Sequence, residues 1–339
     1  MSQINIGNKI VGDDHPTYII LEIARTYNNL DEAKEMISIA ADAGANAIKI
    51  QSILANELMV KNSHTYDYVE MLESLERTEE QHKFLKKVCM ENKIDFLSTP
   101  EGPTMIKLLE RIDIPAYKAS SLDFVYYDLL RNMALTKKPI ILSTGMAEYE
   151  EICETVNFLE KLKVDFALLH CSSTYPTKPN NANLRNISFL KSEFGKVVGY
   201  SDHTVGIQAP ILAVSLGASI VEKHFTLDRN QKGADHYVGV DEKMLREMIY
   251  GIRITEEMLG SYERKLCDEE AEMKNFKRRK MVASTNLNKG DEITKQEIKI
   301  LQTKSNQGID GRYVENIVGK KIVQDIECDH IFSWENFYE

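Results

Sequence analysis

Short apolar segments rich in β-branched residues alternate along the chain with longer segments whose apolar residues recur every three to four positions. The short segments predict strands, and the longer ones predict amphipathic helices. One of these helices carries its apolar stripe at Met36, Ile37 and Ala40. We expect it to begin near Asp31 and to end at Gly44. Eight strands are expected before residue 260, at 18–23, 47–51, 95–98, 116–118, 139–143, 166–170, 197–200 and 219–223.

A regular alternation of strands and helices predicts parallel strands joined by right-handed crossovers. Eight such units within roughly 260 residues match the size of a (β/α)8 barrel, or TIM barrel. A doubly wound open sheet is the alternative, but no GxGxxG motif follows the first predicted strand. We therefore expect an α/β fold in which residues 1–260 form a TIM barrel.

The composition changes after residue 260. Residues 261–280 are dense in Glu, Lys and Arg, which predicts a solvated linker or a surface helix. Residues 281–339 form a β-rich module with a weak internal repeat, 286–298 and 325–337, and each half predicts a strand, a turn, a strand and a short helix capped by Thr294 or Ser333. Because about sixty residues seldom fold strongly alone, we expect this module to dock on a barrel, its own or a partner's.

The overall charge and the cysteine pattern narrow the class of protein. The 339 residues carry a net charge of -10, which argues against a nucleic-acid or anionic-membrane partner. The sequence has neither a signal peptide nor an apolar stretch of membrane-spanning length, so we expect a cytoplasmic protein. The five cysteines are scattered without CxxC spacing, which predicts neither disulfides nor a zinc knuckle.

Polar residues gather at the carboxyl ends of the predicted strands, where barrel enzymes build their active sites. Buried charges are costly unless they are paired, so a cluster of them at one barrel mouth predicts an anion site. Taken alone, Lys49 is as well explained by a structural ion pair, and Asp123 by a helix N-cap. Two lysines among several hydroxyls suit a small anion that carries phosphate and carboxylate groups. These strand-end residues, which we call the predicted ring, are Glu22, Lys49, Gln51, Ser98, Thr99, Lys118, Ser120, Ser121, Asp123, Ser143, Thr144, His170, Ser173, Thr174, Tyr175, Ser201, Asp202, His203, Glu222 and His224.

His203 and His224 end the last two predicted strands, and one helix lies between them, so their imidazoles are expected to meet at the barrel mouth. Two histidines with oxygen ligands suit Mn²⁺, Mg²⁺ or Co²⁺ better than a closed zinc site. The alternative is that one ring packs in the core and the other bonds in a loop, because the HExxH spacing is absent. Glu22, Asp123 and Asp235 are acceptors for sugar hydroxyls or for proton transfer.

The segments around these residues resemble, in order, those of the sialic acid synthase family. The carboxyl-terminal module resembles that family's antifreeze-like SAF domain, a small β-rich β-clip fold, with Lys289-Gly290 and 318–320 in matching places. The family condenses phosphoenolpyruvate with an N-acylated hexosamine, such as N-acetylmannosamine or a 2,4-diacetamido-2,4,6-trideoxyhexose. The products are a nine-carbon α-keto acid and phosphate. The matching segments are 22–23, 49–51, 97–100, 117–121, 142–146, 169–176, 199–204 and 222–225.

The resemblance implies a role for each matching residue. His203 and His224 would bind the metal, with Mn²⁺ expected first, and Glu22, Lys49 and Asp123 would join them in catalysis. Phosphoenolpyruvate would contact Lys49, Gln51, Thr99, Lys118, Ser121, Ser143, Ser173, Tyr175 and Ser201. The amino sugar would face Glu22, Asp123, Asp235 and Lys304. A domain-swapped homodimer is implied as well, in which each SAF domain caps the barrel of the other subunit.

The chain departs from the family pattern mainly on the sugar side. The sequence at 26–29 replaces a His-Asn-Gly loop, Asp123 replaces a longer glutamate, Ser173 replaces an asparagine of some members, and Lys304 replaces an arginine. The sequence therefore does not determine which sugar is the acceptor. A second phosphoenolpyruvate-dependent barrel enzyme, acting on an aldose phosphate, would need a further cluster of Arg or Lys that these strand ends lack. A non-catalytic sugar-binding relative is the third alternative.

Overall fold

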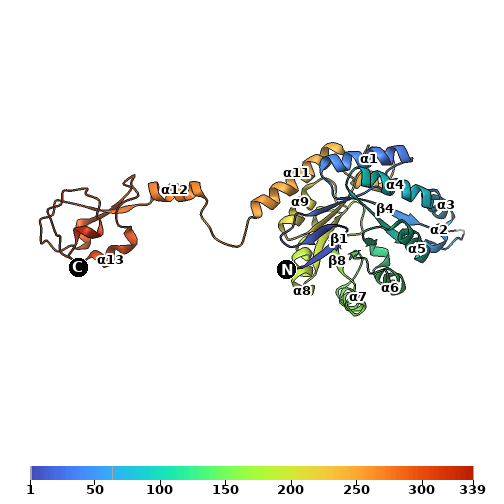
Figure 1. Cartoon of the computed structure of the whole chain (residues 1–339), viewed down its shortest axis with the longest axis horizontal. Helices are drawn as coiled ribbons and strands as arrows, with labels where there is room; N and C mark the ends of the chain where they lie inside the picture. The colour runs from blue at the N-terminus through green and yellow to red at the C-terminus, as the bar shows by residue number, and fades with distance from the viewer. Residues whose placement is uncertain (1, 63, 339) are drawn as a thin grey trace. The chain divides into compact units, whose positions relative to one another are not determined.

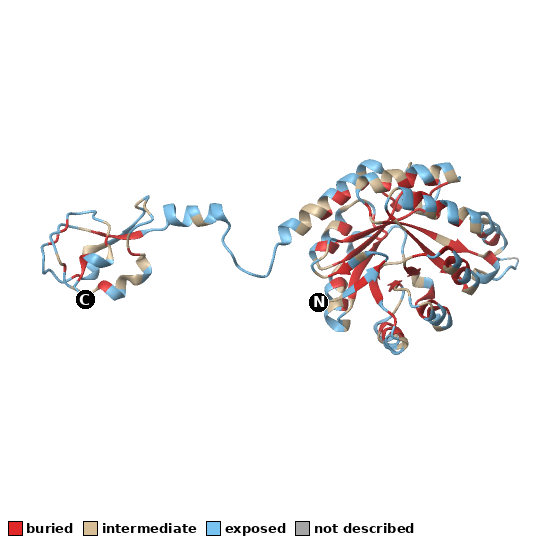
Figure 2. Cartoon of the chain, viewed as in Figure 1, coloured by how far each residue is buried: buried red, intermediate tan, exposed pale blue. Residues whose placement is uncertain are grey.

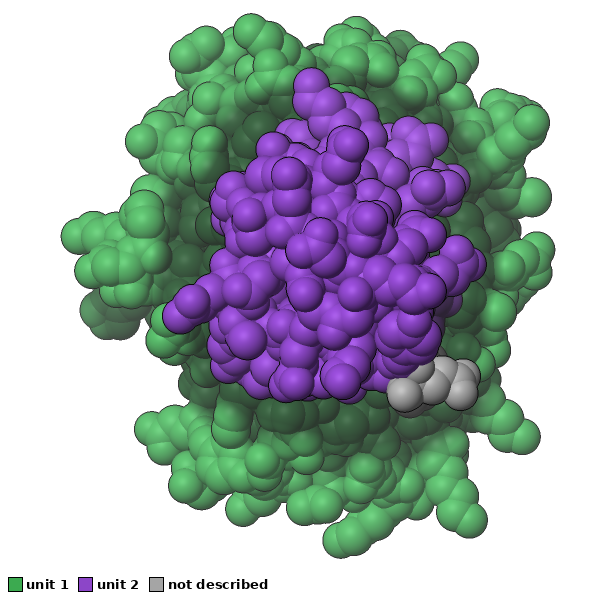
Figure 3. All heavy atoms as spheres, turned by 90° about the vertical axis from the view of Figure 1, so that its left-hand side faces the viewer, with its two compact units in different colours: residues 1–260 green, residues 261–339 purple. Residues whose placement is uncertain are grey.

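The computed structural model describes residues 2–62 and 64–338. The chain separates into two compact units, Met1–Gly260 and Ser261–Glu339 (Figure 3). Each unit has its own hydrophobic core, so each is described by itself.

Unit 1 is a closed barrel of parallel strands surrounded by helices (Figure 1). The predicted TIM barrel is confirmed. The last strand, β10, pairs with the first, β3, and places His224 opposite Glu22. In barrel order the strands are β10 (Ile220–His224), β3 (Tyr18–Glu22), β4 (Ala47–Ile53), β5 (Asp95–Glu101), β6 (Tyr117–Ala119), β7 (Ile140–Ser143), β8 (Phe166–Cys171) and β9 (Val197–Asp202).

The helices cover the outside of the barrel and bury one face each (Figure 2). In α1 the Asn29 side chain accepts hydrogen bonds from the N–H groups of Asp31 and Glu32, and Gly44 ends the helix in the left-handed conformation. The predicted helix end is therefore confirmed. The outer helices are α1 (Leu30–Ala43), α4 (Glu79–Glu91), α5 (Pro103–Ile112), α6 (Tyr127–Leu135), α7 (Tyr149–Leu162), α8 (Arg185–Phe194), α9 (Gln208–Ser215) and α11 (Glu242–Leu259), with α10 (Ala234–Val238) after β10.

A hairpin that the sequence analysis did not predict contributes to the barrel interior. Its antiparallel strands are β1 (Gln3–Ile6) and β2 (Lys9–Gly12). Ile4, Ile6 and Val11 join one buried cluster with inward-facing residues near the amino-terminal ends of the barrel strands, such as Leu97 and Ile220. The interior is therefore filled with apolar side chains at that end.

An insertion between β4 and α4 carries two short helices, α2 (Ala55–Leu58) and α3 (Tyr66–Leu75). It has a small core of its own, formed by Ile53, Ala55, Val69 and Leu72. None of the helices in the described ranges is long and apolar enough to cross a membrane.

Unit 2 begins with α12 (Asp268–Lys277), a helix without buried residues. The rest of the unit is built from short elements around a core that includes Met281, Ile309 and Phe332. Thr294 caps the 3₁₀ helix η3 (Lys295–Glu297), and Ser333 precedes η5 (Trp334–Asn336), as the internal repeat predicted. Within the described residues, the strands predicted before these helices are present only as isolated bridges, such as Leu287 with Ile326. The remaining elements are β11 (Lys280–Ala283), antiparallel β12 (Ile298–Leu301), η4 (Gly311–Tyr313) and α13 (Val314–Ile317).

Candidate active site

A cavity of about 720 Å³ opens at the carboxyl ends of the barrel strands. Its size suits a ligand or ligand pair of small-molecule dimensions. All the residues that the sequence analysis singled out for substrate or metal line it, except Lys304. These lining residues are Glu22, Lys49, Gln51, Thr99, Lys118, Ser121, Asp123, Ser143, Ser173, Tyr175, Ser201, His203, His224 and Asp235.

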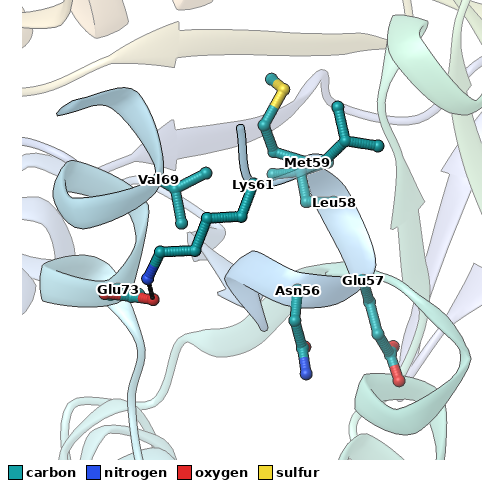
Figure 4. A pocket seen from close by; sticks show the side chains of 8 residues that line it. Asn56, Glu57, Leu58, Met59, Lys61, Val69 and Glu73 are labelled. Carbon is teal, nitrogen blue, oxygen red and sulfur yellow. Dashed lines mark hydrogen bonds and ion pairs between the residues drawn. The ribbon is translucent and has the colours of Figure 1, made fainter. Parts of the chain in front are cut away.

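A second cavity of about 390 Å³ lies in the β4–α4 insertion (Figure 4). It shares Glu57, Leu58 and Met59 with the first cavity. Its only opposite charges in contact are Lys61 and Glu73, an exposed pair 3.0 Å apart. Because none of the predicted ligand-binding side chains reaches it, we assign the chemistry to the larger cavity.

Two buried lysines and two buried glutamates form a charged network on the cavity floor. Lys49 Nζ lies 2.6 Å from Glu22 Oε2 and 3.4 Å from Glu222 Oε2, and Lys118 Nζ lies 3.9 Å from Glu222 Oε2. Burial alone would raise the pKa of Glu222, but Lys118, Lys49 and the Ser201 hydroxyl together lower it to about 2. Glu222 therefore stays ionised and holds both ammonium groups at the mouth of the barrel.

Hydroxyl and amide donors converge beside Lys118. Lys118 Nζ donates to Ser143 Oγ at 2.7 Å, and the Gly145 N–H donates to Ser121 Oγ at 3.0 Å. A Cβ at Gly145 would lie 2.2 Å from Ser173 Oγ and 2.7 Å from Ser121 Oγ, so glycine lets both hydroxyls approach the backbone there. These groups form a cradle for a small anion.

The Thr99 hydroxyl is a further donor for a ligand. Its Oγ1 is buried and has no hydrogen-bond partner within the described part of the chain. Buried polar atoms are normally satisfied, so an orphaned hydroxyl at the wall of a cavity points to a bound partner.

The two histidines meet as predicted, with ring centroids 5.4 Å apart. Nδ1 of His203 lies 2.8 Å from the Ser172 carbonyl oxygen, which can only accept, so Nδ1 carries the proton. In the neutral ring Nε2 is then left as the acceptor, 2.7 Å from the Tyr175 hydroxyl. Burial lowers the pKa of His224 well below its ordinary value, so this ring is neutral at pH 7.

These rings fit a divalent metal. Nδ1 of His224 is buried without a hydrogen-bond partner in the described residues, and the Asp235 carboxylate lies 3.8 Å from it. The fixed tautomer of His203, held by a backbone carbonyl, is the usual arrangement of a metal-binding imidazole. Among residues 2–62 and 64–338 no group of three or more His, Cys, Asp and Glu side chains is arranged to hold a metal. Two protein ligands would therefore leave positions for water or substrate oxygens.

Alternation along the strands separates the lining residues from other polar residues of the predicted ring. Ser98 is fully buried on the opposite side of β5 and bonds to Ser52 at 2.6 Å. His170 bonds to the Ala182 carbonyl, and Asp202 accepts from Lys223 Nζ at 2.6 Å. These three residues support the barrel wall and do not line the cavity. Lys304 is an exposed residue of unit 2 and is not among the lining residues.

Glu101 and Arg25 line the cavity although the sequence analysis did not name them. Glu101 ends β5, two residues after Thr99, and therefore faces the same side of the strand. The alternation could have revealed it, but the predicted strand ended at 98, and Pro100 favoured a strand end. Arg25 follows β3 and donates to Gln51 Oε1 at 3.3 Å.

Comparison with known proteins places this geometry in a family. The family model described as NeuB family matches residues 36–264. An uncharacterized protein of Methanocaldococcus jannaschii is 40% identical over 99% of both chains. The N,N'-diacetyllegionaminic acid synthase of Legionella pneumophila is 32% identical over 97% of both chains. The crystal structure of the N-acetylneuraminic acid synthetase from Leptospira borgpetersenii superposes with a TM-score of 0.75 at 34% identity, covering 81% of this chain and 96% of that one. The chain belongs to the NeuB family.

Proposed function

We propose that the chain is a nonulosonic acid synthase. It would condense phosphoenolpyruvate, water and an N-acylated hexosamine to a nine-carbon α-keto acid and phosphate. One observation carries the proposal: a single cavity joins an anion cradle with two lysines to a pair of adjacent histidines. The cradle suits phosphoenolpyruvate, and the histidines suit a metal beside the acceptor aldehyde. The synthases among the relatives, at 32% identity and above in the two named, support the same reaction class.

The cradle would bind the two anionic ends of phosphoenolpyruvate. Lys118, Ser143 and the Ser121–Gly145 pair would hold the phosphate, together with the orphaned Thr99 hydroxyl. Lys49, Gln51 and Ser201 would hold the carboxylate. A fixed cradle of this kind would orient C3 of phosphoenolpyruvate toward the acceptor.

His203 and His224 would hold a divalent cation, with Mn²⁺ expected before Mg²⁺ or Co²⁺. The cation would supply Lewis-acid polarisation of the acceptor carbonyl. The new bond would join C3 of phosphoenolpyruvate to the aldehyde carbon. Water would add at C2, and the bond between C2 and the phosphate oxygen would break. Of the two protons of the water, one would go to the aldehyde oxygen and the other would leave with the phosphate. Glu22 and Asp235 lie close to His224 and would hold sugar hydroxyls or take the proton that the water loses.

The test of this function is phosphate release combined with the mass of the product. Release should require phosphoenolpyruvate, a divalent metal and an acceptor from a panel of N-acylated hexosamines, and the product should have the mass of a nine-carbon keto acid. Added EDTA should abolish release, and added Mn²⁺ should restore it. Release without any acceptor, or none with any acceptor, would contradict the proposal.

An aldose phosphate acceptor fits the cavity less well. Within the described residues the cations that line it are Arg25, Lys49 and Lys118, and both lysines are engaged at the floor. The rest of the wall carries carboxyl groups, which repel a second phosphate.

Unit 2 would be an SAF domain, and the functional form would be a homodimer in which each SAF domain covers the other subunit's cavity. The small core of unit 2 supports a docking role, because a module of this size gains little stability alone. Truncation after Gly260 should convert a dimer to a monomer in sedimentation analysis and should raise KM for the acceptor. A fully active monomer would contradict the capping arrangement.

A further inference from the structure

Glu101 is a buried acid that the proposed chemistry leaves unused. Its side chain is 4% exposed and lines the cavity from the end of β5. Oε2 of Glu101 has no hydrogen-bond partner among the described residues. A buried polar atom without a partner is energetically costly, so an unpartnered acid at a cavity wall indicates a hydrogen bond to a ligand.

Asp123 forms a pair with Glu101. Both side chains line the same cavity, and the Ser120 hydroxyl donates to Asp123 Oδ2 at 2.8 Å. Burial, followed by the repulsion of Asp123, raises the pKa of Glu101 to about 8. Burial raises the pKa of Asp123 as well. Because two buried carboxylates repel each other, the pair holds one proton and one negative charge at neutral pH, with the proton on Glu101.

The pair lies across the barrel mouth from the histidines. In the closed order β10-β3-β4-β5-β6-β7-β8-β9, the strand opposite β9 is β5 and the strand opposite β10 is β6. Glu101 ends β5 and Asp123 follows β6, whereas His203 follows β9 and His224 ends β10. An acceptor held by its aldehyde at the histidines would therefore extend toward this pair.

We propose that Glu101 and Asp123 select the acceptor by the group it carries at the end remote from the aldehyde. This inference rests on the proposed function. The pair binds a hydrogen-bond donor there, a hydroxyl or an amide N–H, through the free Glu101 oxygen, and its negative charge rejects a phosphate ester. Glu101 is thus a specificity-determining residue for this chain, and the acceptor class is an unphosphorylated, N-acylated sugar.

The test compares two acceptors that differ in one group, N-acetylmannosamine and its 6-phosphate, at saturating phosphoenolpyruvate and Mn²⁺. The wild-type protein should show a kcat/KM for the unphosphorylated sugar higher by roughly a hundredfold. The double variant E101Q/D123N keeps the size of both side chains and removes their charge. It should shift the ratio of the two kcat/KM values toward the phosphorylated sugar by roughly tenfold or more. KM for phosphoenolpyruvate is measured as well, because Lys49 and Lys118 of the cradle act on Glu101; a change that is equal for both acceptors cancels in the ratio.

A matched control is E91Q/D128N, which makes the same two amide substitutions at exposed residues of α4 and α6. It should leave the ratio unchanged. An unchanged ratio in E101Q/D123N would overturn the assignment of Glu101 and leave the synthase function standing. So would equal use of both acceptors by the wild type, which requires no variant to fold. If the wild type turns over neither acceptor nor any other N-acylated hexosamine, the synthase function fails, and this inference fails with it.

Discussion

The two ends of the barrel interior are filled by opposite kinds of side chain, although the same eight strands build both. On β3 the inward position changes from Ile20 to Glu22, and on β10 it changes from Ile220 to Glu222. On β5 it changes from Leu97 to Thr99. The change takes two residues, which is one repeat of the strand. Folding energy and ligand chemistry are therefore separated along the barrel axis, and substitutions at the two ends should affect different measurements.

The largest effect is expected at the histidines. His203→Ala or His224→Ala should lower the rate of phosphate release by roughly a thousandfold or more, because each removes one of the two ligands proposed for the metal. The melting temperature should change little, since neither ring contributes to the apolar cluster. Partly exposed His15 provides the control, His15→Ala, which should retain activity. Near-normal release by His203→Ala would remove the metal from the proposed mechanism.

Lys118→Met should separate activity from stability. Loss of the ammonium group should lower kcat/KM for phosphoenolpyruvate by roughly a hundredfold, because a charge-assisted contact to phosphate is lost. Burial lowers the pKa of Lys118, so its charged form costs folding energy. Replacement by an apolar side chain removes that cost, but it also removes the cation that most lowers the pKa of buried Glu222; the free energy of unfolding should therefore fall by less than about 3 kcal/mol, the lower end of what breaking a buried pair costs. Steady-state kinetics and urea denaturation test both halves, and a strongly destabilised variant would show that Lys118 is structural.

Leu97→Ala should lower the stability of the protein and leave its activity nearly unchanged. Leu97 is fully buried in the apolar end of the interior, two positions before Thr99 on the same face of β5. Its truncation should lower the free energy of unfolding by about 2–5 kcal/mol, and kcat/KM of the protein that stays folded should change little. A large loss of activity without a loss of stability would break the separation between the two ends.

The smallest effect is a pH dependence of stability. The unfolded chain loses the Glu101 proton near pH 4.5, whereas the folded chain keeps it up to about pH 8. Between these values, raising the pH therefore lowers the free energy of unfolding, on the order of 1 kcal/mol for each pH unit. Glu101→Gln removes this titration, so its stability relative to wild type should rise as the pH is raised from 5 to 8. Parallel stability curves across this range would show that Glu101 ionises at its ordinary pKa.

The sequence predicted the barrel because eight β-rich segments and their helices repeat regularly, and strand ends gather at one mouth in that topology. It also predicted the lining residues, through the resemblance and the polarity of the strand ends. The β1–β2 hairpin was missed because its strands are four residues long and of mixed polarity. The polarity of the strand ends, taken alone, did not separate the polar residues that face the cavity from those that do not. Ser98 and Thr99 are both polar, and only the pleat of the strand separates them.

The pairing of β10 with β3 closes the barrel, and this closure has a consequence for synthesis of the protein. Both histidines belong to the last two strands, so the chain must reach residue 224 before the seam can form. A shorter nascent chain has the cradle residues of β4 to β7, but its barrel is not closed and it lacks the imidazole of His224. Metal retention would therefore report completion of the barrel, because a ligand that binds only the closed form stabilises that form.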